Sequence, residues 1–198
     1  MTQAEGRSFF REVVTEPDTT IVADAAIDTF LDRGMEALNA LIGFHHTDDT
    51  SITTVNGTQE YTLPTDSLSV VWVEYGTAML DRLTQEEYRN LETDFRDTAA
   101  GTPTSYYLVG RKIGLHPKPG AAVQLTIRSI TTPVAYGTTA FSQLATQDHR
   151  LPVYYAAQLW LTAHGFDAGF ARAERLLGLF TAEAERAKAF YDARRLSR

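Results

Sequence analysis

Residues 68–75 read LSVVWVEY, and apolar side chains fall on both faces of a strand built from them. A strand that is apolar on both faces is typical of the centre of a β-sheet. We therefore predict a β core that contains Val70 and Trp72. From about residue 51 to about residue 133 apolar residues alternate with polar ones, and turn residues recur at short intervals. This pattern predicts an inserted β domain over residues 51–133.

Shorter signals complete the expected β domain. The sequence EYTLP at residues 60–64 ends a first strand, and Thr84 with Glu87 forms a capping box that begins a short helix over the sheet. Turn residues then separate three strands that we expect to form a meander, at residues 105–109, 113–116 and 121–130. In the last strand Leu125 and Ile127 alternate with polar residues, so both are expected in the core.

Both flanks of the β domain carry helical periodicity. From Asp24 to Ile42 apolar residues recur every three or four positions, and Asp24 can cap the N-terminus of a helix. A second helix is expected at residues 151–164 and a third after Asp167. The third is expected to bury one stripe of side chains: Phe170, Ala173, Leu176, Leu177, Phe180, Ala184, Ala187 and Tyr191. No other part of the chain offers an apolar layer of matching length, so these helices should pack on one another.

These patterns predict an α+β fold. A helical platform is expected from residues 1–50 and 134–198, with a small antiparallel β domain, residues 51–133, inserted between them. The polar residues 45–49 follow neither period and are expected to form a loop after the first long helix. Residues 131–149 are rich in Thr, Gly and Gln and are expected to form a long connection back to the helices.

Composition restricts the classes of function. The formal net charge of −7 argues against a dedicated nucleic-acid binder, because such proteins cluster Lys and Arg against phosphates. A negative surface still lets DNA slide past without specific binding. The absence of cysteine excludes disulfides and thiolate zinc sites. With no apolar run of membrane-spanning length and no secretory leader pattern, we expect no membrane association and assembly in the cytosol.

The sequence carries none of the common catalytic motifs, such as a phosphate-binding loop, a dinucleotide fingerprint, a zinc-protease helix or a serine nucleophile elbow. His45, His46, Asp48 and Asp49 are metal-ligating residue types. Adjacent residues in a loop rarely point at one ion, however, so a solvated loop is the favoured interpretation. We expect no catalytic residue, no cofactor and no metal.

Two further groups of residues keep other functions open. Asp148 and His149 resemble half of an acid/base pair, although such residues are common at helix entries, where they cap the helix. Tyr106, Tyr107 and Tyr136 are candidates for a sugar-stacking platform, although aromatic residues in strands more often pair in the core. The alternatives are a hydrolase with a site split between the β domain and residues 148–149, and a small carbohydrate- or peptide-binding module.

The order of these segments resembles one known family. A helix and a polar loop precede EYTLP, the strand with Trp72, LTQEEY at residues 83–88, GTPTSYY at residues 101–107, IGLHP at residues 113–117 and a last long strand. In order and spacing, over almost the whole chain, this is similar to the head-to-tail adaptor, or connector, proteins of tailed bacteriophages. The terminal helices match only as a pattern.

The resemblance implies a structural virion protein of the neck, assembled in the host cytoplasm. Such adaptors form a ring, commonly of twelve copies, beneath the portal protein of a filled capsid. The ring seals the connector, offers a platform to tail or nozzle proteins and lets double-stranded DNA pass through its channel. The family brings no catalytic residues and no cofactor. Another phage neck or tail-tube component is the nearest alternative.

The C-terminal segment inverts the acidic balance of the chain. From residue 187 onward four basic residues stand against a single acid. Cations near the last carbonyls of a helix are favoured by its macrodipole and need no partner. That effect does not explain Leu196, an apolar residue expected beyond a helix end near Tyr191. In the resembling adaptors the C-terminal segment docks on the portal. We therefore predict that Arg194, Arg195, Leu196 and Arg198 bind an acidic groove between neighbouring portal subunits.

Overall fold

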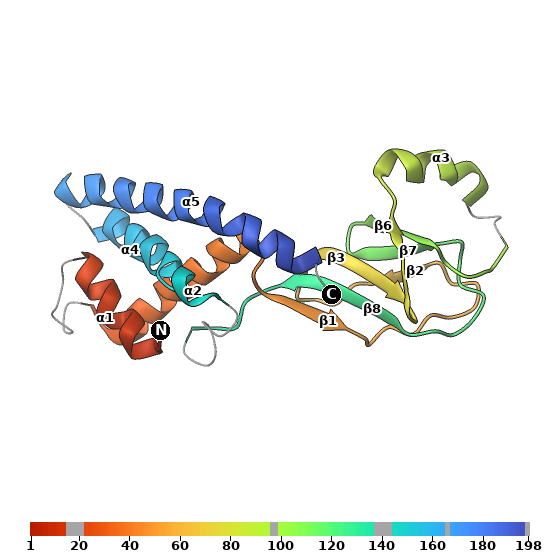
Figure 1. Cartoon of the computed structure of the whole chain (residues 1–198), viewed down its shortest axis with the longest axis horizontal. Coiled ribbons are helices and arrows are strands. Elements are labelled where there is room, and N and C mark those ends of the chain that lie inside the picture. The colour runs from red at the N-terminus through yellow and green to blue at the C-terminus, as the bar shows by residue number, and fades with distance from the viewer. Residues whose placement is uncertain (15–21, 96–98, 137–143, 165–166, 197–198) are drawn as a thin grey trace. The chain divides into compact units, whose positions relative to one another are not determined.

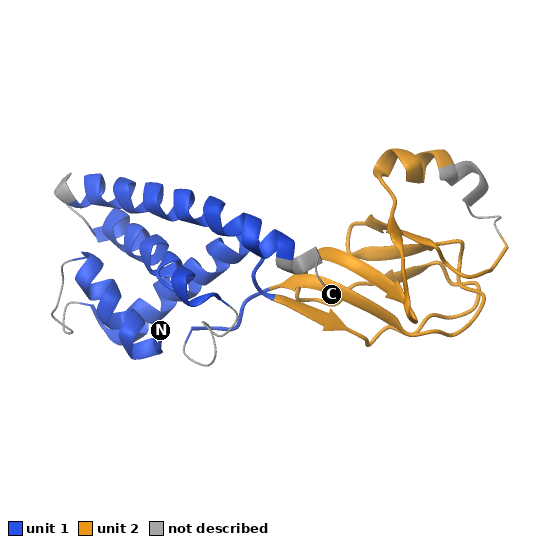
Figure 2. Ribbon diagram, viewed as in Figure 1, with its two compact units in different colours: residues 1–45, 132–198 blue, residues 46–131 orange. Residues whose placement is uncertain are grey.

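The computed structural model describes residues 1–14, 22–95, 99–136, 144–164 and 167–196. The chain divides into two compact units (Figure 2). One is helical and consists of residues 1–45 with residues 132–198, and the other is built on β-sheets and consists of residues 46–131. The α+β class expected from the sequence is confirmed, with helices contributed by both ends of the chain.

The helical unit contains four α-helices among the described residues (Figure 1). They are α1 (Gln3–Val14), α2 (Asp24–Ile42), α4 (Leu151–His164) and α5 (Asp167–Leu196), with a short 3-10 helix, η1 (Thr146–Asp148), before α4. α2 ends where Gly43 adopts a left-handed conformation with a φ of 58°. The N–H of Gly43 then donates to the carbonyl of Asn39, which satisfies one of the last carbonyls of the helix.

α2 and α4 approach closely at a glycine. A Cβ at Gly34 would lie 2.2 Å from the carbonyl oxygen of Pro152, in the first turn of α4. Only a residue without a side chain lets the two backbones come this near. Around this crossing Leu31, Met35 and Leu38 of α2 are buried in the core of the helical unit.

The β unit contains two four-stranded sheets among the described residues. The first has the order β1–β8–β3–β4, with β1 (His46–Asp49), β8 (Leu125–Thr131), β3 (Ser67–Tyr75) and β4 (Ala78–Met79). The second has the order β2–β7–β6–β5, with β2 (Glu60–Thr62), β7 (Lys112–His116), β6 (Ser105–Val109) and β5 (Asp81–Arg82), and α3 (Gln85–Phe95) follows β5. Both sheets contribute to one apolar core: Leu63, Val70, Val73, Tyr75, Leu80, Tyr106, Ile113, Leu115, Leu125 and Ile127. Val70, Leu125 and Ile127, three of the four residues expected in the β core, are among them.

Three expectations about the strands need correction. β6 and β7 form a hairpin, but β8 pairs with β1 and β3 in the other sheet, so these three strands are not a meander. β5 runs parallel to β6, so the second sheet is not purely antiparallel. The polar residues His46–Asp49 form a strand rather than a loop, because their backbone pairs with β8 at the edge of the first sheet, where polar side chains are tolerated.

Trp72 lies outside the buried core, contrary to expectation. The pairing of β3 with β8 shifts its register between Val70 and Trp72, so the buried residues of β3 are Val70, Val73 and Tyr75. Trp72 is half-buried, and the guanidinium carbon of Arg128 lies 4.7 Å from the centroid of its ring. The irregularity in the pairing therefore turns the largest side chain of the strand away from the core.

Candidate functional site

α5 packs on the helical unit through one stripe and exposes apolar side chains elsewhere. The buried stripe consists of Ala173, Leu176, Phe180, Ala184, Ala187 and Tyr191. Phe170 and Leu177, which the sequence periodicity placed on this stripe, are instead 47% and 40% exposed. Leu179 and Phe190 are 43% and 49% exposed. α5 therefore carries more apolar surface than its packing within the unit uses.

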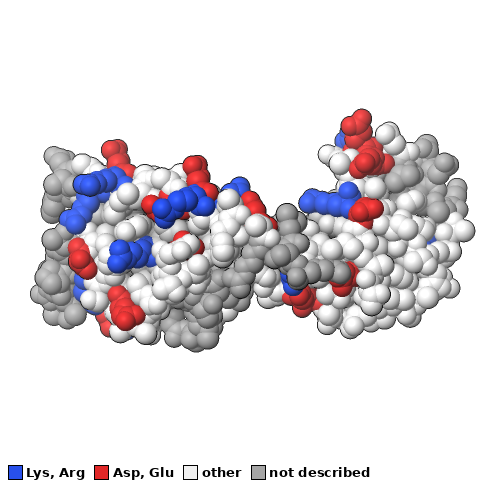
Figure 3. Space-filling view, in the orientation of Figure 1, with Lys and Arg blue, Asp and Glu red and all other residues white. Residues whose placement is uncertain are grey.

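The four exposed side chains lie on opposite flanks of the buried stripe. In a helix with about 3.6 residues per turn, Phe170 and Leu177 project on one side of the stripe, and Leu179 and Phe190 project on the other. Between the flanks, on the outer face, a Cβ at Gly178 would have no described atom within 4 Å. On the face shown in Figure 3, the Lys and Arg side chains of the helical unit are interspersed with Asp and Glu. The flanks, rather than a charged patch, are thus the distinctive surface of α5.

Sequence reasoning missed these flanks because it assigned Phe170 and Leu177 to the buried stripe. The available signal was the spread of apolar residues around the helix, which is wider than one stripe requires. A helix with apolar residues on several sides is usually covered on several sides.

Asp148 and His149, the candidate acid/base pair, make separate structural contacts. Asp148 is buried, and its carboxylate accepts a hydrogen bond of 3.0 Å from the hydroxyl of Tyr191. The same hydroxyl accepts a hydrogen bond of 2.8 Å from the N–H of Ala145. Nε2 of His149 donates to the carbonyl of Leu144 at 3.1 Å. Asp148 therefore ties the last buried residue of α5 to the segment that leads into α4.

The histidines and aspartates of residues 45–49 are divided between the two units. His45 is buried in the helical unit, where its backbone N–H donates to Oδ1 of Asn39. In the β unit the guanidinium of Arg128 donates two hydrogen bonds of 2.6 Å to the carboxylate of Asp48 and lowers the pKa of that carboxyl below its ordinary value. Within the described ranges of the chain, no group of three His, Cys, Asp or Glu side chains is arranged to hold a metal ion.

The three tyrosines of the candidate sugar platform do not gather at one surface. Tyr106 and Tyr107 are buried in the β unit, whereas Tyr136 is buried in the helical unit and donates to the carbonyl of Gln3 at 3.2 Å. Burial raises the pKa of the Tyr107 and Tyr136 hydroxyls well above the ordinary value of a tyrosine. All three act as core residues.

The sequence matches the profile of the SU10 adaptor protein family over residues 7–198. The chain belongs to the SU10 adaptor protein family. The match spans both units, so the helices and the inserted sheets are parts of one adaptor. The resemblance to bacteriophage head-to-tail adaptors predicted from the sequence is confirmed. No curated protein matches the sequence.

Membership of the SU10 adaptor family indicates a structural role in the neck of a bacteriophage virion, in contact with portal and tail proteins. The family is one of structural adaptors. Among the helices that the structure describes, none combines the length and the apolar character needed to cross a membrane.

The predicted portal-docking residues lie at the end of this SU10 adaptor chain. α5 continues to Leu196, so Leu196 belongs to the helix and not to a segment beyond it, which corrects the expectation. The side chains of Arg194, Arg195 and Leu196, and the whole of Arg198, lie outside the described residues.

Proposed function

We propose that this SU10 adaptor forms a homo-oligomeric ring of twelve copies beneath the portal. There it seals the connector and offers a platform to tail or nozzle proteins, and it acts through contact alone, without catalysis. Double-stranded DNA passes through the ring, and the net charge of −7 favours sliding over binding to the phosphate backbone. The observation that carries the proposal is the family match over residues 7–198.

The two apolar flanks of α5 support a ring of identical copies. Neighbours in a ring meet head to tail, so each copy must present two different surfaces, one to each neighbour. In this proposal the flank of Phe170 and Leu177 on one copy packs against the flank of Leu179 and Phe190 on the next copy. The side chains of both flanks are 40–49% exposed in the single chain, so each flank can cover apolar surface of the other.

The lateral contacts are small, so the portal templates the ring. Two pairs of apolar side chains offer too little surface to hold a ring together in dilute solution. Copies bound to adjacent portal sites are held at a high effective concentration, which makes weak lateral contacts sufficient. Alone, the chain is therefore monomeric or weakly associated.

The flanks are tested with the double variant Phe170→Ser/Leu177→Ser. Its thermal unfolding should match that of the wild type, while the number of copies bound to portal-bearing heads, measured by cryo-electron microscopy, should fall below twelve. The matched control is Val55→Ser/Leu68→Ser, which removes apolar side chains that are 57% and 62% exposed in the β unit and should leave a full ring. Full rings from the flank variant would show that the lateral contact lies elsewhere.

A stable high-order ring of the isolated chain, seen by light scattering at micromolar concentration, would contradict templating by the portal.

Portal docking is proposed for Arg194, Arg195, Leu196 and Arg198, which bind an acidic groove between neighbouring portal subunits. The excess of basic residues after residue 187 supports this in a chain that is otherwise acidic. The end of the buried stripe of α5 at Tyr191 supports it as well, because the residues that follow are not required for the described core.

Another neck position or a place in the tail tube is the alternative within the virion. A map of the whole particle distinguishes them, because it gives the position and the copy number of the chain together. A carbohydrate-binding module is not favoured, since its candidate tyrosines are buried in two different units.

A further inference from the structure

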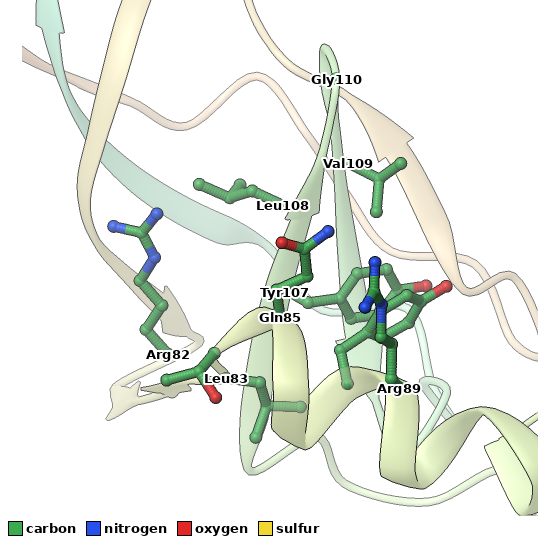
Figure 4. A pocket seen from close by; sticks show the side chains of 10 residues that line it. Arg82, Leu83, Gln85, Arg89, Tyr107, Leu108, Val109 and Gly110 are labelled. Atoms are coloured by element: carbon green, nitrogen blue, oxygen red, sulfur yellow. The ribbon is translucent and has the colours of Figure 1, made fainter.

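A hollow of about 710 Å³ lies in the β unit between the start of α3 and the hairpin of β6 and β7 (Figure 4). Arg82 of β5 and Arg89 of α3 stand at opposite ends of it. Tyr107 and Leu108 of β6 line it, together with Val109, whose side chain is 49% exposed. Its volume falls within the range of about 300–1,000 Å³ that is usual for binding pockets.

The aromatic wall of the hollow is fixed before any ligand arrives. The rings of Tyr88 and Tyr107 stack with their centroids 4.3 Å apart. A Cβ at Gly114 would lie 1.8 Å from an atom of the Tyr107 ring, so only glycine lets this ring lie across β7. The capping box holds the first turn of α3, because the N–H of Thr84 donates to the carboxylate of Glu87 at 2.7 Å and the N–H of Glu87 donates to the hydroxyl of Thr84 at 3.2 Å.

The charge of the hollow is opposite to that of the chain. Its described lining includes Arg82 and Arg89 and no Asp or Glu, in a chain with a net charge of −7. Neither arginine forms an ion pair with a side chain that the structure describes, which on α3 are those of residues 85–90. Of the two acids in the first turn of α3, Glu87 is engaged by the capping box, and Glu86 does not line the hollow.

We propose that this hollow binds an acidic peptide segment of a partner protein. A carboxylate of the segment pairs with Arg82 or Arg89, at one end of the hollow, and an apolar side chain next to it packs on Tyr88 and Val109. Arginine is suited to this role because its planar guanidinium matches a carboxylate with two parallel hydrogen bonds. The proposal rests on the hollow alone and does not depend on the ring.

A peptide fits the hollow better than a nucleic acid does. A long polyanion would meet the negative charge of the whole chain, whereas a segment with one or two carboxylates meets mainly the two nearby arginines. The exposed apolar side chain of Val109 also has no counterpart in a phosphate backbone, but it matches a leucine or a phenylalanine beside the carboxylate.

The test is selection of a displayed library of random dodecapeptides on the immobilised full chain. We expect the enriched peptides to share an Asp or Glu next to an apolar residue. Their affinity should fall at least about tenfold for Arg82→Gln/Arg89→Gln and should recover in part for Arg82→Lys/Arg89→Lys. The matched control is Arg33→Gln/Arg175→Gln, which removes two exposed arginines from the helical unit and should leave the affinity unchanged.

Three results would overturn the proposal. One is the absence of any enriched peptide, and another is enrichment of peptides that lack acidic residues or bind the Arg82→Gln/Arg89→Gln variant equally well. The third is tight binding of a fluorescent single-stranded DNA that is lost in that same variant, which would make the hollow a nucleic-acid site. Both arginines are exposed, so equal thermal unfolding of all variants confirms that the fold is intact.

Discussion

At the scale of single residues, β3 and β8 place two large side chains in contrasting surroundings. Ile127 of β8 is fully buried between the sheets, whereas Trp72 of β3 is half-buried under the guanidinium of Arg128. Size alone would rank Trp72 as the larger contributor to stability. Burial reverses this ranking, because the contribution of a side chain to the free energy of unfolding is roughly proportional to the apolar area that it removes from water.

Ile127→Ala is therefore expected to destabilise the β unit more than Trp72→Ala. The first variant leaves a cavity in the core and should cost about 2–5 kcal/mol. The second gives up a cation–π contact of about 0.5–1 kcal/mol and the area of a half-buried ring. Urea unfolding of both variants at equal temperature measures the difference. A larger loss for Trp72→Ala would mean that Trp72 belongs to the core after all.

The ion pair between Asp48 and Arg128 predicts a dependence of stability on pH. Because Arg128 lowers the pKa of Asp48 below the ordinary value of 3.8, the contribution of this pair is complete above that pH and is lost as the pH falls through the lower, folded value. Asp48→Asn should thus be less stable than the wild type near neutral pH, and the gap should close on acidification. The Asp48 side chain is 41% exposed, so the gap is small. Asp81→Asn, which changes an exposed carboxylate of the other sheet, is the matched control. If the stability difference between Asp48→Asn and the wild type stayed constant down to acid pH, the ion pair would not be its cause.

At the scale of elements, the two helical glycines Gly34 and Gly178 have opposite surroundings. A Cβ at Gly34 of α2 would collide with the backbone of Pro152, whereas a Cβ at Gly178 of α5 would meet no described atom within 4 Å. The same substitution therefore has opposite expected signs in two helices of one unit.

Gly178→Ala should stabilise the chain by about 0.5–1 kcal/mol, because alanine is the better helix former. Gly34→Ala should destabilise it in spite of the same gain in helix propensity, since α2 and α4 would have to separate. Thermal unfolding of the two variants side by side gives both signs in one experiment. A destabilised Gly178→Ala would indicate that the outer face of α5 is not open in the single chain.

Helices and sheets were predictable to different degrees, for physical reasons. The bounds of α2 followed from local periodicity, and Thr84 with Glu87 identified the start of α3. The partner of β8 was not predictable, because strand pairing depends on residues distant in sequence. β8 is the last strand of the β unit, and it pairs with β1, the first. The shift that moves Trp72 out of the core has no local sequence signature. On α5, periodicity located the helix but did not separate Phe170 from the buried stripe.

At the scale of the whole molecule, the portal docking proposed for the C-terminal segment predicts that folding and attachment can be separated. Removal of residues 193–198 should leave the unfolding temperature almost unchanged, because the buried stripe of α5 ends at Tyr191. Binding to the portal should weaken at the same time, since Arg194, Arg195 and Arg198 are lost. Sedimentation of the truncated chain with portal-bearing heads, at several salt concentrations, measures attachment. Full occupancy by the truncated chain would place the docking surface elsewhere.

The candidate interaction surfaces were less accessible to sequence reasoning than the fold. The basic residues near the C-terminus stand out in an acidic chain and identify a candidate at once. The hollow beside α3 does not, because Arg82, Arg89 and Tyr107 come from three elements that only folding brings together. The family was therefore predictable from the sequence, whereas the lining of the hollow depends on the folded chain.

The chain enters the β unit at β1 and leaves it at β8, and His46 stands opposite Ile130 in the ladder that joins these two strands. Both crossings of the boundary therefore lie at one rung, only about 5 Å apart. Such a place is a tolerant insertion site. A domain whose two ends lie at that spacing can replace the β unit without a change in the packing of α2, α4 and α5. The inserted module can thus vary in sequence and length while the helical unit around it stays unchanged.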